Sequence, residues 1–452
     1  MLRPRHTALF LGSAVAALGL AASRCSFSDP PIAATDAGAD IVDGSVPDNK
    51  PPQCKVLPRP ANVPAGWELA KNVDPCCGFY TPTAIEQMPP PIAWEPCPSD
   101  HVPAGSTCRQ MAVDWPRDGN TRPLWVEDRA AQLRGDGNVT LLFERFGANG
   151  RFELMADSDG VVRVALMNTL KYGCVAAPRH LSSDRYGFAV KFPGTAQGMI
   201  VGDLSSLSPL GVLSSESSES WLPGLPGVLH VAPNQDMNLI PWDKLGGGPS
   251  IHISSPAEED GRQQSFPFFE DQAIFWNSTT LAFQGFRVWT PMDGKQSFID
   301  YGGDYTRGVH GLGSDGADLV WNEGEGRTNP NDVFPTNWVM TSPFTTDPKA
   351  LKPRKVRQTG AYGAVDPYRV GCGYAAHVMG LTSSDAYAEV IRLSDGVAWR
   401  FVLNRPMWTW NAPIAITCDE IFVHIQSKGP LGTYEESVAR IRLDSLGPGS
   451  PP

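Results

Sequence analysis

The sequence predicts an all-β fold, a β-propeller with seven four-stranded blades. Three observations point to it: a unit that recurs about every 47 residues, a strand-like run at the same place in each unit, and an abundance of turn formers, with 45 Gly and 42 Pro among 452 residues. Repeats of this length suit four-stranded blades. Six or eight blades and a stacked β-sandwich are the alternatives, because the repeat is irregular.

The repeat is marked by aspartates that end an alternating or apolar run. Successive markers lie 40 to 54 residues apart, and three of them are followed directly by glycine. An Asp-Gly pair supplies the positive φ angles of a tight hairpin. The markers are Asp159, Asp203, Asp243, Asp293, Asp347, Asp395 and Asp444.

A run that reads as a strand precedes each marker. Several of these runs lack period-two alternation, as expected for strands buried on both faces between neighbouring blades. The runs are VTLLFERF (139–146), YGFAVKF (186–192), VLHVA (228–232), QAIFWN (272–277), DLVWNE (318–323), YAAHVM (374–379) and EIFVHI (420–425).

The last unit, from Pro413 to Gly447, ends after its third strand. Its fourth strand must come from elsewhere, and RQMAVDW (109–115), just before the first unit, is the candidate. This closure would remove the exposed edges of a long β-array.

The N-terminal 25 residues have the character of an export signal. A basic start precedes an apolar stretch from Ala8 to about Ala22 that is too short and too rich in small residues for a membrane span. Cys25 is a candidate lipid anchor, as the first residue of a mature lipoprotein, although Arg24 stands where such a site wants a small residue. We therefore expect a secreted or outer-envelope protein of the periplasm or cell surface, with any membrane contact through that anchor.

The stretch that follows is rich in Ala, Asp and Pro and lacks hydrophobic periodicity, so it predicts a flexible tether. The expected organisation is a signal peptide (1–25), a disordered tether (26–64), a cysteine-rich segment (65–108), the propeller (109–447) and a short tail (448–452).

Eight cysteines remain when Cys25 is set aside, and five of them lie between residues 54 and 108. An even number in an exported protein predicts up to four disulfides. Cys97 and Cys108, which bracket a short turn, are the favoured pair. A bridge between Cys372 and Cys418 is geometrically conceivable, because they precede equivalent strands of adjacent units. A zinc site is the weaker alternative, since paired C-x-x-C spacing is absent from the sequence.

Two segments interrupt the rhythm and read as loop-like insertions, ESSESWLPGLPG (216–227) and PAEEDGRQQSFPFFE (256–270). Loops on a rigid scaffold often carry binding specificity. The aromatic residues of these insertions are therefore ligand-binding candidates, although packing over the ring is the preferred interpretation. They are Trp221, Phe266, Phe268 and Phe269.

Catalytic and metal signals are weak. The chain contains no G-x-S-x-G, H-E-x-x-H, P-loop or dinucleotide fingerprint. MADSDG (155–160) resembles the start of a calcium loop, but a hairpin turn explains it better. Four histidines in strand-like runs could converge on the central channel, although core histidines are the preferred interpretation. They are His230, His310, His377 and His424.

The blade-like segments GADLVWNEGE (316–325) and ARIRLDSL (439–446) resemble the repeats of TolB-like periplasmic β-propellers. The resemblance covers about residues 109 to 447 and rests on blade rhythm. It implies a six- or seven-bladed ring used mainly as a protein-binding platform, and it carries over no functional residue.

These features favour an exported, non-enzymatic propeller that binds a protein or a cell-surface polymer such as a polysaccharide. No catalytic residue, metal ligand or cofactor is assigned, calcium being the one possibility, and we expect a monomer. The formal charge of −11 argues against nucleic acid as a partner. The alternative is a propeller enzyme, a polysaccharide or lactone hydrolase or lyase, with a carboxylate or calcium site at the channel mouth.

Overall fold

The computed structural model describes most of the chain beyond residue 57. The described residues are 58–71, 77–91, 93–97, 106–111, 131–133, 139–147, 150–157, 159–168, 175–181, 185–191, 197–203, 211–215, 220–245, 248–279, 284–301, 304–329, 334–359, 368–379, 387–402, 413–428 and 434–452. All of them belong to one compact unit, Asp48–Pro452.

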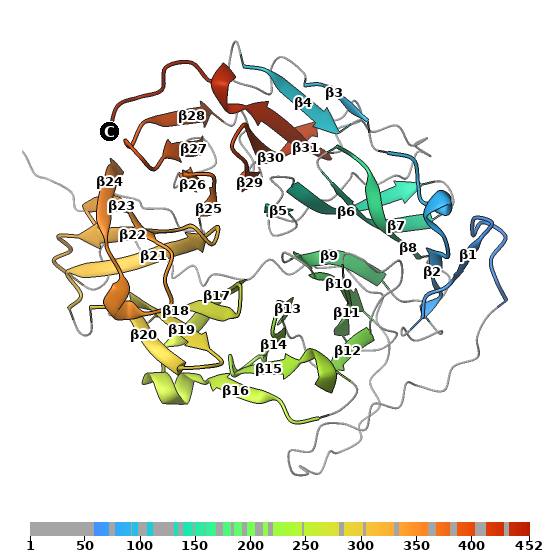
Figure 1. Cartoon of the computed structure of the whole chain (residues 1–452), viewed down its shortest axis with the longest axis horizontal. Helices are drawn as coiled ribbons and strands as arrows, with labels where there is room; N and C mark the ends of the chain where they lie inside the picture. The colour runs from blue at the N-terminus through green and yellow to red at the C-terminus, as the bar shows by residue number, and fades with distance from the viewer. Residues whose placement is uncertain are drawn as a thin grey trace, which may run out of the picture. The chain divides into compact units, whose positions relative to one another are not determined.

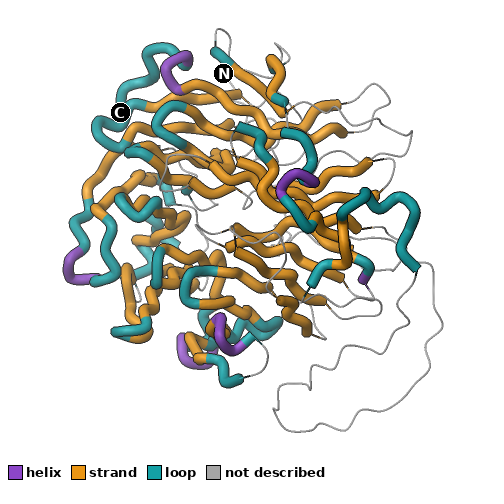
Figure 2. Tube along the Cα trace, turned by 45° about the vertical axis from the view of Figure 1, so that its right-hand side comes forward, coloured by secondary structure: helices purple, strands orange, loops and turns teal. Residues whose placement is uncertain are grey.

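The strands of this unit form seven sheets arranged around a common centre, so the fold is an all-β propeller (Figure 1). Figure 2 shows strands throughout the unit, with short helical turns at its margins. The described helices are 3-10 turns: η2 (Ile85–Gln87), η3 (Trp242–Lys244), η4 (Pro256–Glu259), η5 (Pro348–Ala350) and η6 (Leu443–Ser445). None of the described helices has the length and apolar character needed to cross a membrane.

Five sheets take four strands each from one continuous stretch of chain. The second sheet contains β9 (Val175–Leu181), β10 (Arg185–Lys191), β11 (Gln197–Asp203) and β12 (Gly211–Ser215). The third contains β13 (Ser220–Pro223), β14 (Gly227–Val231), β15 (Met237–Pro241) and β16 (Ile251–Ser254). The fourth contains β17 (Gln263–Glu270), β18 (Ala273–Thr279), β19 (Gln284–Thr290) and β20 (Gly294–Asp300). The fifth contains β21 (Arg307–Ser314), β22 (Asp318–Glu325), β23 (Thr336–Pro343) and β24 (Arg354–Thr359). The sixth contains β25 (Arg369–Gly371), β26 (Tyr374–Met379), β27 (Tyr387–Arg392) and β28 (Ala398–Val402).

The first and seventh sheets are larger because they also recruit the N-terminal segment. The first runs in the order β1 (Trp67–Leu69), β2 (Phe79–Pro82), β8 (Val162–Asn168), β7 (Gly150–Asp157), β6 (Val139–Gly147) and β5 (Ala131–Leu133). The seventh runs in the order β29 (Pro413–Ile416), β30 (Glu420–Lys428), β31 (Tyr434–Arg442), β4 (Cys108–Met111) and β3 (Trp94–Pro96).

The ring is closed by strand β4, which precedes strands β5 to β8 of the first sheet in the sequence but pairs with β31 of the last sheet. The register sets Gln110 opposite Ala439 and Cys108 opposite Ile441, and the strands are antiparallel. The predicted closure is therefore confirmed for the described part of 109–115. Joining the two ends of the ring in one sheet covers strand edges that would otherwise be open to other chains.

The seven aspartate markers all lie at or just after the third strand of a sheet, one in each sheet. Glycines follow three of them, and Gly160, Gly294 and Gly396 have φ angles of 86°, 67° and 75°. These are the tight hairpins that the Asp-Gly pairs predict. Of MADSDG (155–160), residues 155–157 end strand β7, and Asp159 and Gly160 lie between β7 and β8.

The hydrophobic core lies between neighbouring sheets. Phe275 of β18 packs toward the fifth sheet with Leu319 and Trp321, whereas Ile274 and Trp276 of the same strand pack toward the third sheet. Residues on both faces of β18 are thus buried, which explains why this run and its equivalents lack alternation. Each such side chain contributes roughly 2 to 3 kcal/mol through burial.

Two segments predicted to be loop-like insertions contain strands in their described residues, so that prediction is wrong there. Residues 216–227 contain β13, and 256–270 contain η4 and β17. A register irregularity between Ser265 and Phe268, where Pro267 interrupts the ladder, breaks the alternation of β17. The third and fourth sheets therefore begin in stretches whose sequence does not look like a strand.

Candidate functional site

The η4 turn is the link between two adjacent sheets, joining β16 of the third to β17 of the fourth. Its sequence favours such a turn, because Ser255 caps it, Pro256 occupies its first position and Glu258 Oε2 accepts a hydrogen bond from the Ser255 backbone N–H at 3.3 Å. Asp260 ends it in a left-handed conformation with φ 54°. The turn thereby sets Glu258 and Glu259 side by side over the seam between the sheets.

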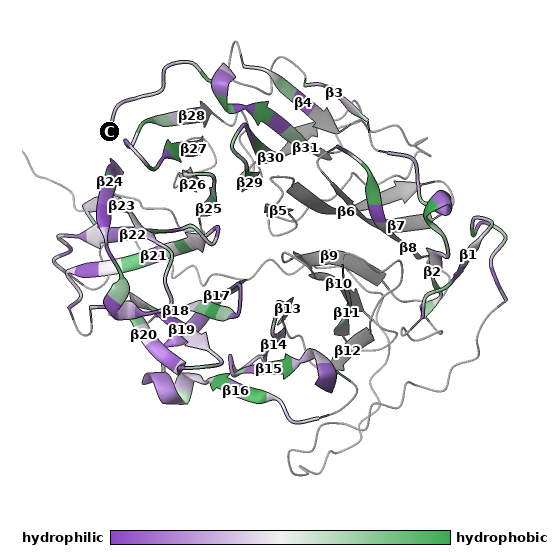
Figure 3. Cartoon of the chain, in the orientation of Figure 1, coloured by the Kyte–Doolittle hydropathy of each residue, from purple (hydrophilic) through white to green (hydrophobic). Residues whose placement is uncertain are grey.

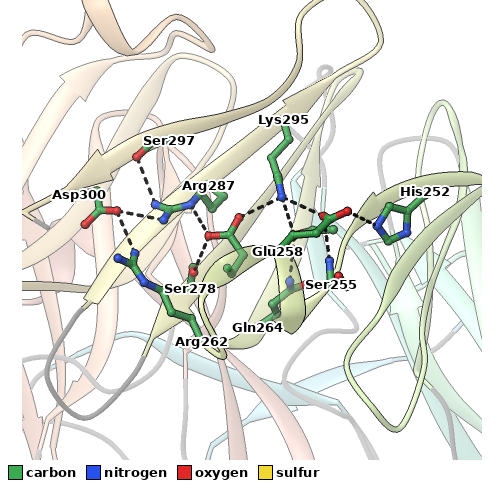
Figure 4. Close-up of polar contacts among 12 residues, drawn as sticks. His252, Ser255, Glu258, Arg262, Gln264, Ser278, Arg287, Lys295, Ser297 and Asp300 are labelled. Carbon is green, nitrogen blue, oxygen red and sulfur yellow. Dashed lines mark hydrogen bonds and ion pairs between the residues drawn. The ribbon is translucent and has the colours of Figure 1, made fainter.

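Glu259 is the buried centre of a charged network. Figure 4 shows other members of it, among them Arg287, Lys295 and Asp300. Its carboxylate accepts from Arg287 Nε at 2.9 Å and from Ser278 Oγ at 3.3 Å, and its exposed fraction is only 7%. Asp300 lies between Arg287 and Arg262, at 2.9 Å from each. Because the buried charges alternate in sign, each one has a partner that offsets its loss of hydration.

The other end of the network reaches solvent. Lys295 Nζ lies 3.2 Å from Glu259 and 3.0 Å from Glu258, and Glu258 in turn lies 3.1 Å from His252 Nε2. His252 Nδ1 is 3.3 Å from Asn238 Oδ1. The hydrogen bond from Lys295 lowers the pKa of Glu258. Figure 3 shows the hydrophilic character of η4 and β20 at this seam.

The network is defined as Arg262, Asp300, Arg287, Glu259, Lys295, Glu258 and His252. Its first six members are side chains of alternating charge, and it ends at the imidazole of His252. Such a chain stabilises the loop between two sheets and presents a fixed, partly exposed polar end. Each of its carboxylates is paired with a cation, so this arrangement suits recognition better than proton transfer.

A different carboxyl group has the properties of an acid or base. Glu270 ends β17, the first strand of the fourth sheet, and its side chain lies near the β21–β22 hairpin, with Oε1 3.2 Å from where a Cβ on Gly316 would stand. Burial raises its pKa to about 7, opposed by a hydrogen bond with Ser314 and assisted by the charges of Asp315 and Asp271. A carboxyl group of this pKa can exchange a proton near neutral pH.

A third polar cluster lies between the fifth and sixth sheets. Glu389 on β27 is fully buried, and the register places it between His377 and Arg400. Its Oε1 lies 2.9 Å from Arg400 Nε and 3.6 Å from Nε of Arg357, and its Oε2 lies 3.3 Å from His377 Nε2. Burial alone would raise the pKa of Glu389, but His377 and Arg400 outweigh it and lower the pKa to about 2.

The histidines predicted as possible channel ligands lie in separate packing environments. His230 stacks on Trp221 at 4.2 Å, His310 stacks on Phe334 at 6.4 Å, and His377 contacts Glu389. Burial lowers the pKa of His310 to about 4. The side chain of His424 lies outside the described residues. Among the residues that the structure describes, no three His, Cys, Asp or Glu side chains are grouped as metal ligands.

The aromatic candidates pack into the ring. Trp221 is 7% exposed, Phe268 stacks on Phe275 at 5.3 Å, and Phe269 packs against the core between the third and fourth sheets. The side chain of Phe266 lies outside the described residues. The described aromatics thus serve packing, the preferred interpretation of the sequence.

Two disulfides join strands that are close in space. Cys97 pairs with Cys108, the pair that the sequence favoured, and links β3 to β4 with Cα atoms 5.5 Å apart. Cys372 pairs with Cys418 and links the β25–β26 turn of the sixth sheet to the β29–β30 turn of the seventh. Cys77 is disulfide-bonded as well. Cys25, the candidate anchor, lies outside the described residues.

Sequence reasoning missed the charged network, Glu270 and the Glu389 cluster. A capping pattern, Ser255-Pro-Ala-Glu258, was the one local signal for η4. The partners of Glu259 and Glu389 come from other strands or from the next sheet, and no sequence periodicity reveals such pairs.

No protein-family model matches the chain, and no curated protein matches it. The TolB-like resemblance therefore stays a prediction. Solved structures match at low identity, among them a prolyl endopeptidase, with 10% identity, a TM-score of 0.41, and coverage of 73% of this chain and 49% of that one.

The β-propeller domain of the Trilobed protease from Pyrococcus furiosus matches with 11% identity, a TM-score of 0.42, and coverage of 72% of this chain and 100% of that one. The acylaminoacyl peptidase of Pyrococcus horikoshii matches with 10% identity, a TM-score of 0.42, and coverage of 73% and 54%. The matched region spans about half of the prolyl endopeptidase and of the acylaminoacyl peptidase. Similarity at this level carries no argument about activity.

Proposed function

We propose that this chain is an exported, non-enzymatic β-propeller that binds a protein or a cell-surface polymer. The observation that carries the proposal is the charged network, which holds the η4 link rigid and leaves its outer end in contact with solvent. His252 and Glu258 are 48% and 45% exposed there, beside Lys295 at 27%. A polar surface fixed in advance loses little conformational entropy on binding.

We further propose that each of the seven sheets is one blade of a single ring. The presence of one aspartate marker at the third strand of every sheet supports this count. A six-bladed ring, which the sequence also allowed, would require one sheet to stand outside the ring.

The proposal includes export and an oxidising compartment. Disulfides in the propeller support an extracellular or periplasmic environment. We propose a signal peptide at residues 1–25, lipidation of Cys25 and a tether over 26–64, with a monomeric ring and no nucleic-acid partner. Mass spectrometry of the protein isolated from its source would test the lipid, because acylation adds a defined mass to the peptide that begins at Cys25.

Retention on isolated cell-envelope material tests the binding function. We expect residues 26–452 to be retained and the double variant His252→Ala/Glu258→Gln to be retained at least about fivefold less, because it loses the exposed end of the network. Asp444→Asn, which alters a solvent-exposed pair elsewhere, is the control. Protease and periodate treatment of the envelope distinguish a protein from a polysaccharide partner. Equal retention of both variants and the parent would contradict the assignment.

The alternative, a propeller enzyme acting on a polysaccharide or lactone, is favoured by one observation, the carboxyl group of Glu270 with a pKa of about 7. Hydrolysis of a glycan or lactone panel that vanishes in Glu270→Gln would support it. Loss of thermal stability on adding a chelator would support the calcium form of the same idea. Indifference to chelator, together with envelope retention, would support the binding function instead.

A further inference from the structure

A further segment of the same chain lies along the outer edge of the sixth sheet. Strand β28 is the outermost strand, and residues 447–452 (Gly-Pro-Gly-Ser-Pro-Pro) lie along it. Ala398 and Ser450 form an antiparallel bridge with two backbone hydrogen bonds, Ala398 N to Ser450 O at 3.0 Å and Ser450 N to Ala398 O at 2.7 Å. This is the geometry of strand addition, in which main-chain groups supply the binding.

Two side chains of the propeller donate hydrogen bonds to backbone carbonyl groups of this segment. Arg357 of β24, in the neighbouring fifth sheet, donates from one nitrogen to Pro451 O at 2.6 Å and to Ser450 O at 3.4 Å. Trp399 of β28 donates from Nε1 to Gly447 O at 2.9 Å. Carbonyl groups thus accept from two different sheets, and each of these bonds could form with any extended chain.

The site nevertheless selects for sequence. A Cβ added at Gly449 would stand 2.6 Å from Val397 Cγ1 and 3.0 Å from the Trp399 ring, and Gly449 has a φ of +71°. Glycine is therefore required at this position on two grounds. The described contacts of Pro451 and Pro452 do not use a backbone N–H. Proline, which lacks this donor, therefore fits both positions.

Arg357 also contacts groups of the sixth sheet that do not belong to the segment. With the segment in place it is 7% exposed, its Nε lies 3.6 Å from the buried Glu389, and Nη1, the nitrogen that donates to the segment, also donates to Gly396 O at 3.1 Å. The guanidinium is fixed by the sheets themselves. Ser450, Pro451 and Pro452, by contrast, are solvent-exposed, so the segment contributes backbone contacts at the surface and little to the core.

We propose that the outer edge of the sixth sheet is a binding site for an extended Gly/Pro-rich peptide, which residues 447–452 occupy in cis. The site would take a Gly-Ser-Pro-Pro-like segment of a protein partner after the resident segment leaves. This deepens the proposed binding function by naming a partner class. The resident segment acts at an effective concentration on the order of millimolar, so it excludes weak competitors.

The test uses the chain truncated after Leu446 and a fluorescent peptide of residues 445–452. We expect saturable binding to the truncated protein with a Kd of about 10 μM, and binding to the full chain about 100-fold weaker, because the resident segment competes at a millimolar effective concentration. A peptide with Gly449→Val should bind at least about tenfold more weakly. A peptide with Ser450→Pro, which lacks the N–H that Ala398 O accepts, should show a similar loss.

Folding of the truncated chain is checked by circular dichroism and thermal unfolding. If it does not fold, the full chain with Gly449→Val, which should expel the segment without shortening the protein, replaces it. The proposal is wrong if a folded variant fails to bind the peptide, if the control peptides bind equally well, or if neither variant folds. Peptide binding without envelope retention would separate this site from the network-based function.

Discussion

Glu389 shows how one buried carboxylate can join two sheets. It lies on the sixth sheet, where His377 and Arg400 contact it from the neighbouring strands. Arg357 approaches it from the fifth sheet. Removing its charge would leave Arg357, which is 7% exposed, without a carboxylate partner. An unpaired buried cation is costly, so the effect should far exceed that of a surface pair.

We expect Glu389→Gln to lower the free energy of unfolding by about 3 kcal/mol. Urea denaturation at pH 7 measures this, with Asp444→Asn as the control, because Asp444 pairs with Arg442 in solvent and should show no measurable change. Because the pKa of Glu389 is lowered, its contribution is complete above about pH 4.5 and declines as the pH falls toward 2. Equal stability of the two variants would contradict the assignment of Glu389 as a joint between sheets.

Glu270 has the opposite dependence on pH. Its pKa is raised to about 7 by burial, so the folded protein retains a proton that the unfolded chain releases at about pH 4.5. Stability from this residue is therefore full below pH 4.5 and is lost as the pH rises through 7. We expect Glu270→Gln to be more stable than the parent at pH 8, by at most about 3 kcal/mol, and equal to it at pH 4.

Thermal unfolding at several pH values between 4 and 8 measures the effect of Glu270→Gln. Glu86→Gln, at an exposed carboxylate on η2, is the matched control and should leave the pH profile unchanged. A parent and a Glu270→Gln profile that run parallel over this range would show that Glu270 titrates normally.

At the scale of single elements, η4 places two adjacent glutamates in different environments, one buried and one partly exposed. Glu259 points into the seam and binds Arg287, whereas Glu258 is 45% exposed and binds Lys295 and His252. The same chemical change should therefore have different effects at neighbouring positions. This makes the pair an internal control for burial.

We expect Glu259→Gln to cost about 2 to 3 kcal/mol and to make the η4 link more sensitive to proteolysis. Glu258→Gln should cost less than about 0.5 kcal/mol, since solvent and salt screen that end of the network. Urea denaturation and limited proteolysis at low and high salt measure both variants. Equal costs at the two positions would show that the network does not hold the link.

The elements that could be predicted from sequence are those with a local signal. The second strand of each sheet was visible as an apolar run, and the hairpins were visible as Asp-Gly pairs, because burial and turn geometry act on adjacent residues. Strand β17 was mistaken for a loop because Pro267 and a shifted register hide its alternation. The networks around Glu259 and Glu389 had no such signal, since their partners lie on other strands, 11 to 36 residues away in the sequence.

At the scale of the whole molecule, the closed ring depends on contacts between its two ends. Strand β4 pairs with β31, the Thr107 N–H donates to Ser445 Oγ at 2.8 Å, and the Cys97–Cys108 disulfide fastens β3 beside β4. The Cys372–Cys418 disulfide joins the sixth and seventh sheets, which precede this closure. The two bridges therefore act on the same end of the ring but enclose different lengths of chain.

Chain entropy predicts unequal contributions from these two disulfides. The Cys372–Cys418 bridge spans 46 residues and the Cys97–Cys108 bridge spans 11. The corresponding stabilisation is about 4 and about 3 kcal/mol, because a longer loop loses more freedom in the unfolded chain. Thermal unfolding of Cys372→Ser/Cys418→Ser and of Cys97→Ser/Cys108→Ser measures both. If the shorter bridge contributes clearly more, its role in closing the ring, by holding β3 against β4 in the folded state, outweighs loop entropy.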